Sequence, residues 1–309
     1  MDVILHIGAH RCATTSFQHY LSENETRLAQ SGLAAWGPAR TRGGLFSSVL
    51  APPGPVMHRR DVRKRAVGRV RMALDHCATL AVSQLLVSDE NLLGSIRHNM
   101  RRGALYAGAG ERVARLVAAC DGRVRDIVLN IRSPELYWAS ALGYGVARGF
   151  CAPEALDVTR FAQAGRTWRD VITDIACAAS GIRLHVLPFE TFGNRPDVQL
   201  HVLSGIAPPR QHARTWQNAT PKLAALRALP GAETLPCGEG RWMPFDRAQR
   251  AALRESYADD LMWLASGADG LATLTTDPEK NRTGTTPPQP DMTRGTRNDR
   301  QEGRMANAR

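Results

Sequence analysis

The chain has 309 residues, 43% of them hydrophobic, and a formal net charge of +11 at pH 7. This length and apolar content suffice for one large α/β core, and no apolar run approaches membrane-spanning length, which excludes a membrane span. The six cysteines form no CxxC pair and no Cys/His cluster at zinc spacing, so they exclude a zinc scaffold and indicate the reduced thiols of a cytoplasmic protein.

The N-terminal segment predicts a strand, a phosphate loop and a helix. An apolar run over residues 3–7 leads into Gly8, and a helix begins at Thr14. This is the layout of a Walker A loop, whose backbone N–H groups surround a phosphate at a helix N-terminus. Ala13 occupies the second glycine position, and Thr14 stands where nucleotide-binding proteins carry a lysine for the β- and γ-phosphates. The loop therefore suits an anion with less charge than a triphosphate, and a first strand that starts at about residue 2 leaves no secretory leader.

The next elements alternate between helices and strands. We predict helices over 14–21 and 24–30, a loop over 37–56, a basic helix over 56–77, a strand over 84–88, a crossover helix over 111–120 and a strand over 124–131. The order β-α-β-α-β implies an α/β fold with a parallel sheet flanked by helices. The basic charge favours anionic partners, but no helix-turn-helix, zinc-knuckle or aromatic RNA-reading motif accompanies it. We therefore expect a solvated basic helix and no nucleic-acid partner.

The second half of the chain predicts further helices and one strand. They are helices over 133–148, 167–180, 196–203 and 245–266, a strand over 182–187, and a helix that Pro221 begins and Thr220 caps. Residues 276–309 have almost no apolar content, so we predict an α/β domain over 1–275 and a disordered basic tail over 276–309.

A second motif follows the strand over 124–131. Arg132 stands at the carboxyl end of that strand, and Ser140 lies eight residues later on the next helix. Eight residues are about two helical turns, so both side chains are expected to face one crevice at the end of a strand beside the first. An arginine fork suits a dianionic phosphate.

The loop resembles that of the sulfotransferase superfamily, which reads Lys-x-Gly-Thr-Thr and holds the 5′-phosphosulfate of PAPS (3′-phosphoadenosine 5′-phosphosulfate). There are two departures from that pattern: an arginine replaces the lysine, and an alanine replaces the glycine. The matching residues are Arg11, Cys12, Ala13, Thr14, Thr15 and, after them, Gln18.

The resemblance extends to the second motif. An arginine at a strand end and a serine eight residues later hold the 3′-phosphate of PAPS in that superfamily, and Arg132 and Ser140 occupy those places. Arg241 stands where cytosolic members carry a basic glycine loop over the same phosphate. The resemblance to bacterial sulfotransferase-like proteins implies a P-loop-type three-layer α/β/α fold. It also implies PAPS as co-substrate without a metal, and transfer to a hydroxyl or amine of a small-molecule, glycan or lipid-linked acceptor.

Sulfuryl transfer needs positive charge on the leaving phosphate and a base for the acceptor proton. Arg11 and the loop amides are expected to supply the charge. Glu90 is the first candidate base, because it lies just past the carboxyl end of a strand, and a dry pocket that raises its pKa would suit it. His10, inside the loop, is the second candidate, whereas His6 on the buried strand is expected to be a satisfied core residue.

Two alternatives stay open. A P-loop kinase or NTPase would bind magnesium nucleotide through Thr14 or Thr15 and Asp89, although the missing lysine counts against it. A catalytically degenerate member of the fold would keep PAP binding but lose transfer, and Arg11 and Ala13 are the departures that favour it. The acceptor is not identified by any motif in residues 37–80, 143–165 or 205–245.

Overall fold

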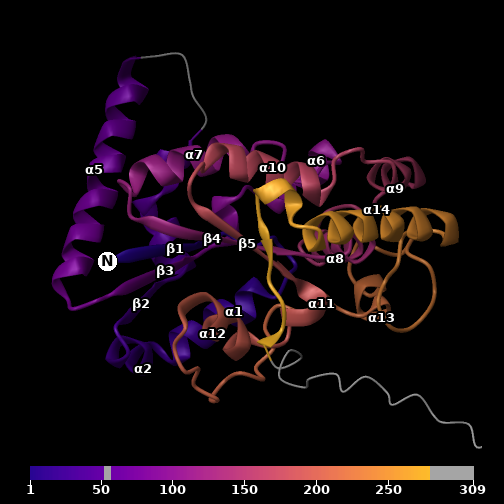
Figure 1. The fold of residues 1–309 in the computed structure, drawn as a ribbon. Coiled ribbons are helices and arrows are strands. Elements are labelled where there is room, and N and C mark those ends of the chain that lie inside the picture. The colour runs from indigo at the N-terminus through magenta and orange to yellow at the C-terminus, as the bar shows by residue number, and fades with distance from the viewer. Residues whose placement is uncertain (52–56, 279–309) are drawn as a thin grey trace, which may run out of the picture. The chain divides into compact units, whose positions relative to one another are not determined.

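Six parallel strands form the sheet, in the order β2-β3-β1-β4-β5-β6. The protein is represented by a computed structural model that describes residues 1–51 and 57–278. Its strands are β1 (Asp2–His6), β2 (Leu33–Trp36), β3 (Gln84–Ser88), β4 (Val124–Ile131), β5 (Arg183–Pro188) and β6 (Thr273–Leu274). The predicted parallel sheet is confirmed, and β1 lies between β3 and β4 (Figure 1).

Helices cover both faces of the sheet, which agrees with a three-layer α/β/α arrangement. In Figure 1, α7 (Ala109–Ala119) and α10 (Trp168–Ala178) lie over one face, and α1 (Thr14–Glu23) and α12 (Pro196–Ser204) lie over the other. The other helices are α2 (Glu25–Gln30), α3 (Pro38–Arg40), α4 (Ser47–Leu50), α5 (Met57–Thr79), α6 (Ile96–Arg102), α8 (Pro134–Val146), α9 (Ala155–Ala162), α11 (Phe189–Phe192), α13 (Leu223–Arg227) and α14 (Arg247–Ala265).

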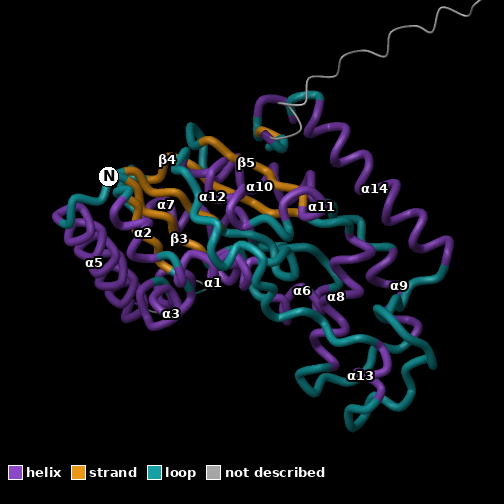
Figure 2. Tube along the Cα trace, turned by 90° about the horizontal axis from the view of Figure 1, so that it is seen from below, coloured by secondary structure: helices purple, strands orange, loops and turns teal. Residues whose placement is uncertain are grey.

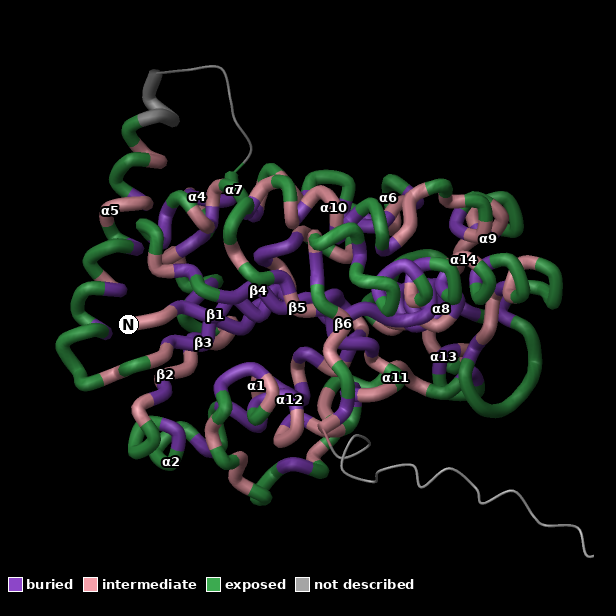
Figure 3. The backbone as a smooth tube through the Cα atoms, in the orientation of Figure 1, coloured by how far each residue is buried: buried purple, intermediate pink, exposed green. Residues whose placement is uncertain are grey.

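The strands are apolar throughout because both of their faces are buried. Successive side chains of β1 point to opposite faces, so Val3 and Leu5 pack in one core with α7 and α10. Ile4, between them, packs in a second core with Phe17 and Leu200 of α1 and α12. Figure 3 shows the buried strands between these two layers. This arrangement leaves the carboxyl ends of β1, β3 and β4 free to carry a site.

His6 at the end of β1 is a satisfied core residue, as predicted. Its ring nitrogens bond the Ser88 hydroxyl at 2.7 Å and the Asn130 side-chain oxygen at 2.6 Å. Burial lowers the pKa of His6 to about 4, so the ring is neutral at physiological pH. The histidine therefore ties β1 to β3 and β4.

Several predicted boundaries are wrong. Residues 37–51, predicted as loop, contain α3, a π-helical turn (Thr41–Leu45) and α4. No helix begins at Pro221: α13 begins at Leu223, with Lys222 at its N-cap, because the Thr220 hydroxyl is bonded elsewhere. The strands β2 and β6 and the helices α6, α9 and α11 were not predicted.

Two observations bear on the other sequence-based expectations. Contacts define one compact unit, Met1–Asp277, and the predicted tail over 276–309 falls almost entirely outside the described residues. Among the helices of the described residues, none combines the length and apolar character needed to cross a bilayer.

Candidate active site

The loop between β1 and α1 takes the form of a phosphate loop. Arg11 and Ala13 both adopt left-handed backbone conformations, with φ of 64° and 61°. Ala13 is the N-cap of α1 and offers no side-chain acceptor, so the first N–H groups of the helix are open to an anion. Two non-glycine residues in the left-handed region cost on the order of 1 kcal/mol each, a strain that is common at functional sites.

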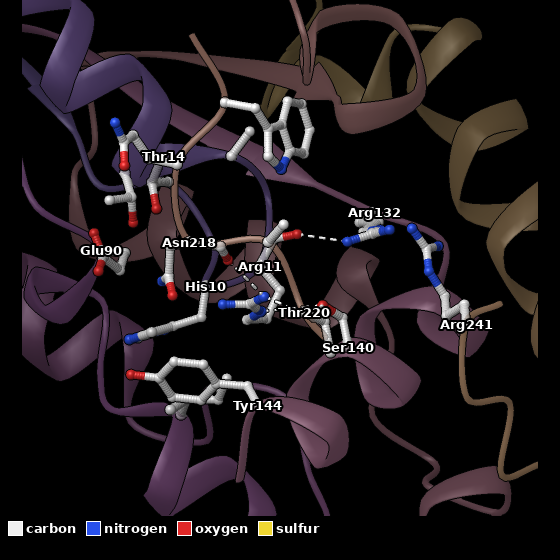
Figure 4. Close-up of a pocket in the computed structure, with 16 residues that line it drawn as sticks. His10, Arg11, Thr14, Glu90, Arg132, Ser140, Tyr144, Asn218, Thr220 and Arg241 are labelled. Carbon is white, nitrogen blue, oxygen red and sulfur yellow. Dashed lines mark hydrogen bonds between the residues drawn. The ribbon is translucent and has the colours of Figure 1, made fainter. Parts of the chain in front are cut away.

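This loop opens into a pocket at the carboxyl ends of β1, β3 and β4 (Figure 4). Loop segments gather beyond the strands, between α1 and α6 (Figure 2). The pocket is lined by His10, Arg11, Ala13, Thr14, Thr15, Glu90, Ile96, Arg132, Ser140, Tyr144, Trp216, Gln217, Asn218, Ala219, Thr220 and Arg241. Nine of these residues were predicted from the sequence as catalytic or donor-binding residues, and the fold brings all nine together. They are His10, Arg11, Ala13, Thr14, Thr15, Glu90, Arg132, Ser140 and Arg241.

Arg11 is the centre of the pocket and is held by neutral groups. Its Nε donates to Ser140 Oγ at 3.0 Å, and one terminal nitrogen donates to Thr220 Oγ1 at 2.8 Å and to the Asn218 carbonyl at 3.0 Å. The guanidinium lies 4.8 Å from the Tyr144 ring centroid. Burial, with the nearby Arg132 charge, lowers the pKa of Arg11 to about 10, so it stays a cation.

Arg132 supplies a second cation from the end of β4. It is 4% exposed, donates to the Arg11 carbonyl at 2.7 Å and lies 4.0 Å from the Phe189 ring centroid. Its Nε is buried without a hydrogen-bond partner, and burial lowers its pKa. No salt bridge joins Arg11, Arg132 or Arg241 to a carboxylate within residues 1–51 and 57–278. A buried Arg132 and a half-buried Arg11, neither of them in a salt bridge with a described carboxylate, favour an anionic ligand.

Residues 216–220, here called the strap, cross the pocket. They lie about 200 positions after the loop in the sequence. The Gln217 N–H donates to Ser16 Oγ at 2.9 Å, and Thr220 Oγ1 lies 2.8 Å from Ser140 Oγ. Arg11 and the strap leave a cavity of about 130 Å³, well below the roughly 300–1,000 Å³ of small-molecule sites. A ligand as large as a nucleotide therefore requires Arg11 and the strap to move.

Glu90 lies at the opposite end of the pocket, where both of its oxygens are engaged. Gln18 donates to Oε2 at 2.8 Å, and Arg42 donates to Oε1 at 2.9 Å. Burial acts to raise the pKa of Glu90, but His10, Gln18 and Arg42 outweigh it and lower the pKa below its ordinary value. The expectation of a raised pKa is therefore wrong, and Glu90 is a carboxylate at neutral pH.

His10 lies in the pocket but has both ring nitrogens engaged. Nε2 lies 3.0 Å from Asn91 Oδ1, an atom that only accepts, so Nε2 carries the proton. Nδ1 then accepts from the Tyr106 hydroxyl at 2.8 Å, and the same hydroxyl accepts from the His10 backbone N–H. Burial lowers the pKa of His10, which keeps the ring neutral.

Two other candidate residues face away from the pocket. Asp89 is 1% exposed, and its carboxylate accepts from both Nε and a terminal nitrogen of Arg42 and from the Thr41 hydroxyl. Cys12 does not line the pocket, because its side chain packs in the core below the loop. Burial raises the pKa of Cys12 to about 12, so the thiol is unreactive. Cys12 can therefore take part in donor binding only through its backbone in the loop, and its predicted place among the donor-binding residues stays a prediction.

Gly8→Ala is expected to destabilise the protein by about 2 kcal/mol. A Cβ at Gly8 would lie 2.5 Å from Cγ2 of Thr14, at the start of α1. Thermal unfolding measures the effect, with Gly37→Ala as the control because nothing lies within 4 Å of a Cβ there. Equal midpoints for the two variants would show that the loop does not depend on this close approach.

Comparison of the chain with protein-family models, with curated proteins and with solved structures finds no match.

Proposed function

We propose that this protein is a sulfotransferase that moves a sulfuryl group from PAPS to a hydroxyl or amine of an acceptor. One observation carries the proposal: half-buried Arg11 and buried Arg132, from the carboxyl ends of neighbouring parallel strands, lie beside the open N-terminus of α1, and neither forms a salt bridge with a carboxylate of the described residues. Such a site suits two anionic groups on one nucleotide. In this proposal Arg132, Ser140 and Arg241 hold the 3′-phosphate, and Arg11, Thr14 and Thr15 hold the phosphosulfate.

The chemistry follows from these placements. The donor supplies the sulfuryl group, and the bond between sulfur and the bridging phosphate oxygen breaks while the acceptor oxygen bonds to sulfur. Arg11 turns from the strap toward the phosphate and stabilises the negative charge that gathers on the leaving oxygen. Glu90 takes the acceptor proton, so that the products are PAP, the sulfated acceptor and a proton.

The kinase alternative is weaker for a reason in the site itself. Asp89, its candidate magnesium ligand, is bonded to Arg42 and Thr41 and does not line the pocket. Thr14 also stands at the lysine position of the loop. A cytoplasmic location belongs to the proposal, and it is supported by the six free cysteines.

Calorimetric titration with PAP, the desulfated product, tests the donor. Wild type is expected to bind PAP more tightly than ATP, and Arg132→Ala with Ser140→Ala is expected to weaken PAP binding about 100-fold, since a buried arginine fork is lost. The matched control is Arg27→Ala with Ser22→Ala, two exposed residues on α2 and α1.

Three outcomes of the titration are informative. Silence toward PAP with magnesium-dependent ATP binding would overturn the proposal and favour a kinase or NTPase. Equal losses of PAP affinity in the two double variants would show that Arg132 and Ser140 do not bind PAP. PAP binding without any turnover of PAPS would identify the catalytically degenerate alternative.

A further inference from the structure

A second cavity lies beside the candidate active site, between α6, α8 and α9. Its volume is about 370 Å³, within the roughly 300–1,000 Å³ of small-molecule sites. The three helices lie together in Figures 1 and 2. The cavity is lined by Arg97, Met100, Arg101, Leu142, Gly145, Phe150, Cys151, Ala152, Pro153, Asp157, Arg160 and Phe161.

The lining combines apolar side chains with arginines. Leu142 and Phe161 are buried, and Phe161 packs against Trp138 with ring centroids 4.7 Å apart. Phe150 is 36% exposed, and the Arg97 guanidinium lies 4.9 Å from its ring centroid. A ligand with an aliphatic or aromatic part could therefore bury that part in the cavity and keep a polar group near the arginines.

The charge of this cavity is not neutralised. Asp157, the acidic residue of the lining, pairs with Arg160 at 3.3 Å. Arg97 and Arg101, four residues apart on α6, have no carboxylate partner among the described residues. Arg97 and Arg101 therefore leave net positive charge beside the apolar lining, which suits a ligand that carries an acid group.

Gly145 lets two apolar side chains of the lining pack against α8, at a cost in helix stability. It lies inside α8, where glycine is about 1 kcal/mol less favourable than alanine. A Cβ there would lie 3.1 Å from the Phe150 ring and 3.6 Å from Met100. The glycine thus makes room for two apolar residues of the lining.

The cavity adjoins the candidate active site through the same two helices. Ile96 and Tyr144 line the active-site pocket, and their chain neighbours Arg97 and Gly145 line the second cavity. Arg148 lies 4.8 Å from the Tyr144 ring centroid, as Arg11 does. The two cavities therefore share the walls that α6 and α8 form.

We propose that this cavity binds a small anionic amphiphile, an organic acid with an aliphatic or aromatic body. Its acid group is held by Arg97 and Arg101, and its apolar body packs against Met100, Phe150 and Phe161. That this ligand is the acceptor of the transfer reaction rests on the proposed function, whereas the binding site itself does not.

Calorimetry with decanoate tests the site, with decanol as the uncharged comparison. Wild type is expected to bind one decanoate, and Arg97→Gln with Arg101→Gln is expected to weaken that binding about ten-fold or more, while the weaker binding of decanol stays unchanged. Gly145→Leu, which fills the cavity, is expected to weaken both ligands. The matched control is Arg65→Gln with Arg69→Gln, two exposed arginines four residues apart on α5.

Decanoate affinity that is equal in wild type and in the Arg97 and Arg101 variant would overturn the proposal. An equal loss in the control variant would also overturn it, because the effect would then reflect net charge alone. Titration of the same proteins with PAP distinguishes the two proposals. If decanoate binds as expected but PAP does not bind, the sulfotransferase proposal is overturned while the proposed decanoate site is supported.

Discussion

Arg11→Ala is expected to lower the turnover of PAPS about a thousand-fold. Arg11 is a partly buried cation beside the phosphate loop, and in the proposed reaction it turns from Ser140, Thr220 and the Asn218 carbonyl to donate to the leaving phosphate. Removing one such donor from a dry site costs about 100- to 1,000-fold in rate, and here a full charge is lost as well. Release of PAP from PAPS with water as acceptor, followed by chromatography, measures the loss without a known acceptor.

Arg11→Lys tests whether turnover depends on the positive charge of Arg11 or on the shape of its guanidinium group. It keeps the positive charge that the resemblance expects at this position but loses the fork that bonds Ser140 and Thr220 together, so a loss of about ten-fold is expected. Arg27→Ala, an exposed arginine on α2, serves as the control for net charge. Wild-type turnover in Arg11→Ala would mean that Arg11 only anchors the strap and takes no part in transfer.

The parts of the site that could be predicted are local in sequence. A strand, a loop and a helix over residues 2–23 form a continuous pattern, and Arg132 and Ser140 lie on one strand end and the helix that follows it. Strand and helix periods fix where such residues point, so their shared pocket follows from the chain itself. The parallel sheet could be predicted for the same reason, because the alternation of strands and helices is a local pattern. The strand β2 contains no β-branched residue, so its sequence did not indicate a strand.

The strap could not be predicted from local pattern. Asn218 and Thr220 meet Arg11 across about 200 positions of sequence, and no periodicity encodes that contact. The Thr220-Pro221 pair has the local signature of a helix start, yet its hydroxyl is used by Arg11 and Ser140. The local sequence therefore favours a helix start at Pro221, but the contacts of Thr220 with Arg11 and Ser140 prevent it.

The same limit applies to the charge state of Glu90. Its place at the end of β3 could be predicted, but its pKa depends on Gln18, His10 and Arg42, which come from two other segments of the chain. Burial alone argues for a raised pKa. The partners that reverse this direction are visible only once the fold has brought the segments together.

Glu90→Gln is expected to lower PAPS turnover by about a thousand-fold, the middle of the roughly 100- to 10,000-fold range of general-base catalysis. Glutamine keeps one acceptor oxygen, which can accept from Arg42 in place of Oε1 while its amide nitrogen takes the place of Oε2 beside Gln18, but it cannot take the acceptor proton. PAP affinity is expected to change by less than about three-fold, because Glu90 lies away from Arg132 and Ser140 (Figure 4). Glu111→Gln, an exposed acid on α7, is the control.

The pH dependence of turnover identifies which residue is the base. Glu90 acts as a carboxylate, and its pKa lies below the ordinary 4.5, so turnover is expected to be flat from pH 6 to 8 and to fall only as the pH drops below about 4.5. In Glu90→Gln that acid limb disappears along with most of the rate. If turnover instead rose through an inflection below pH 6.5 that persisted in Glu90→Gln, the base would be His10, whose pKa is lowered from 6.5 by burial. The hydrogen bonds of His10 to Tyr106 and Asn91 would then have to break during turnover, and Tyr106→Phe would shift the inflection.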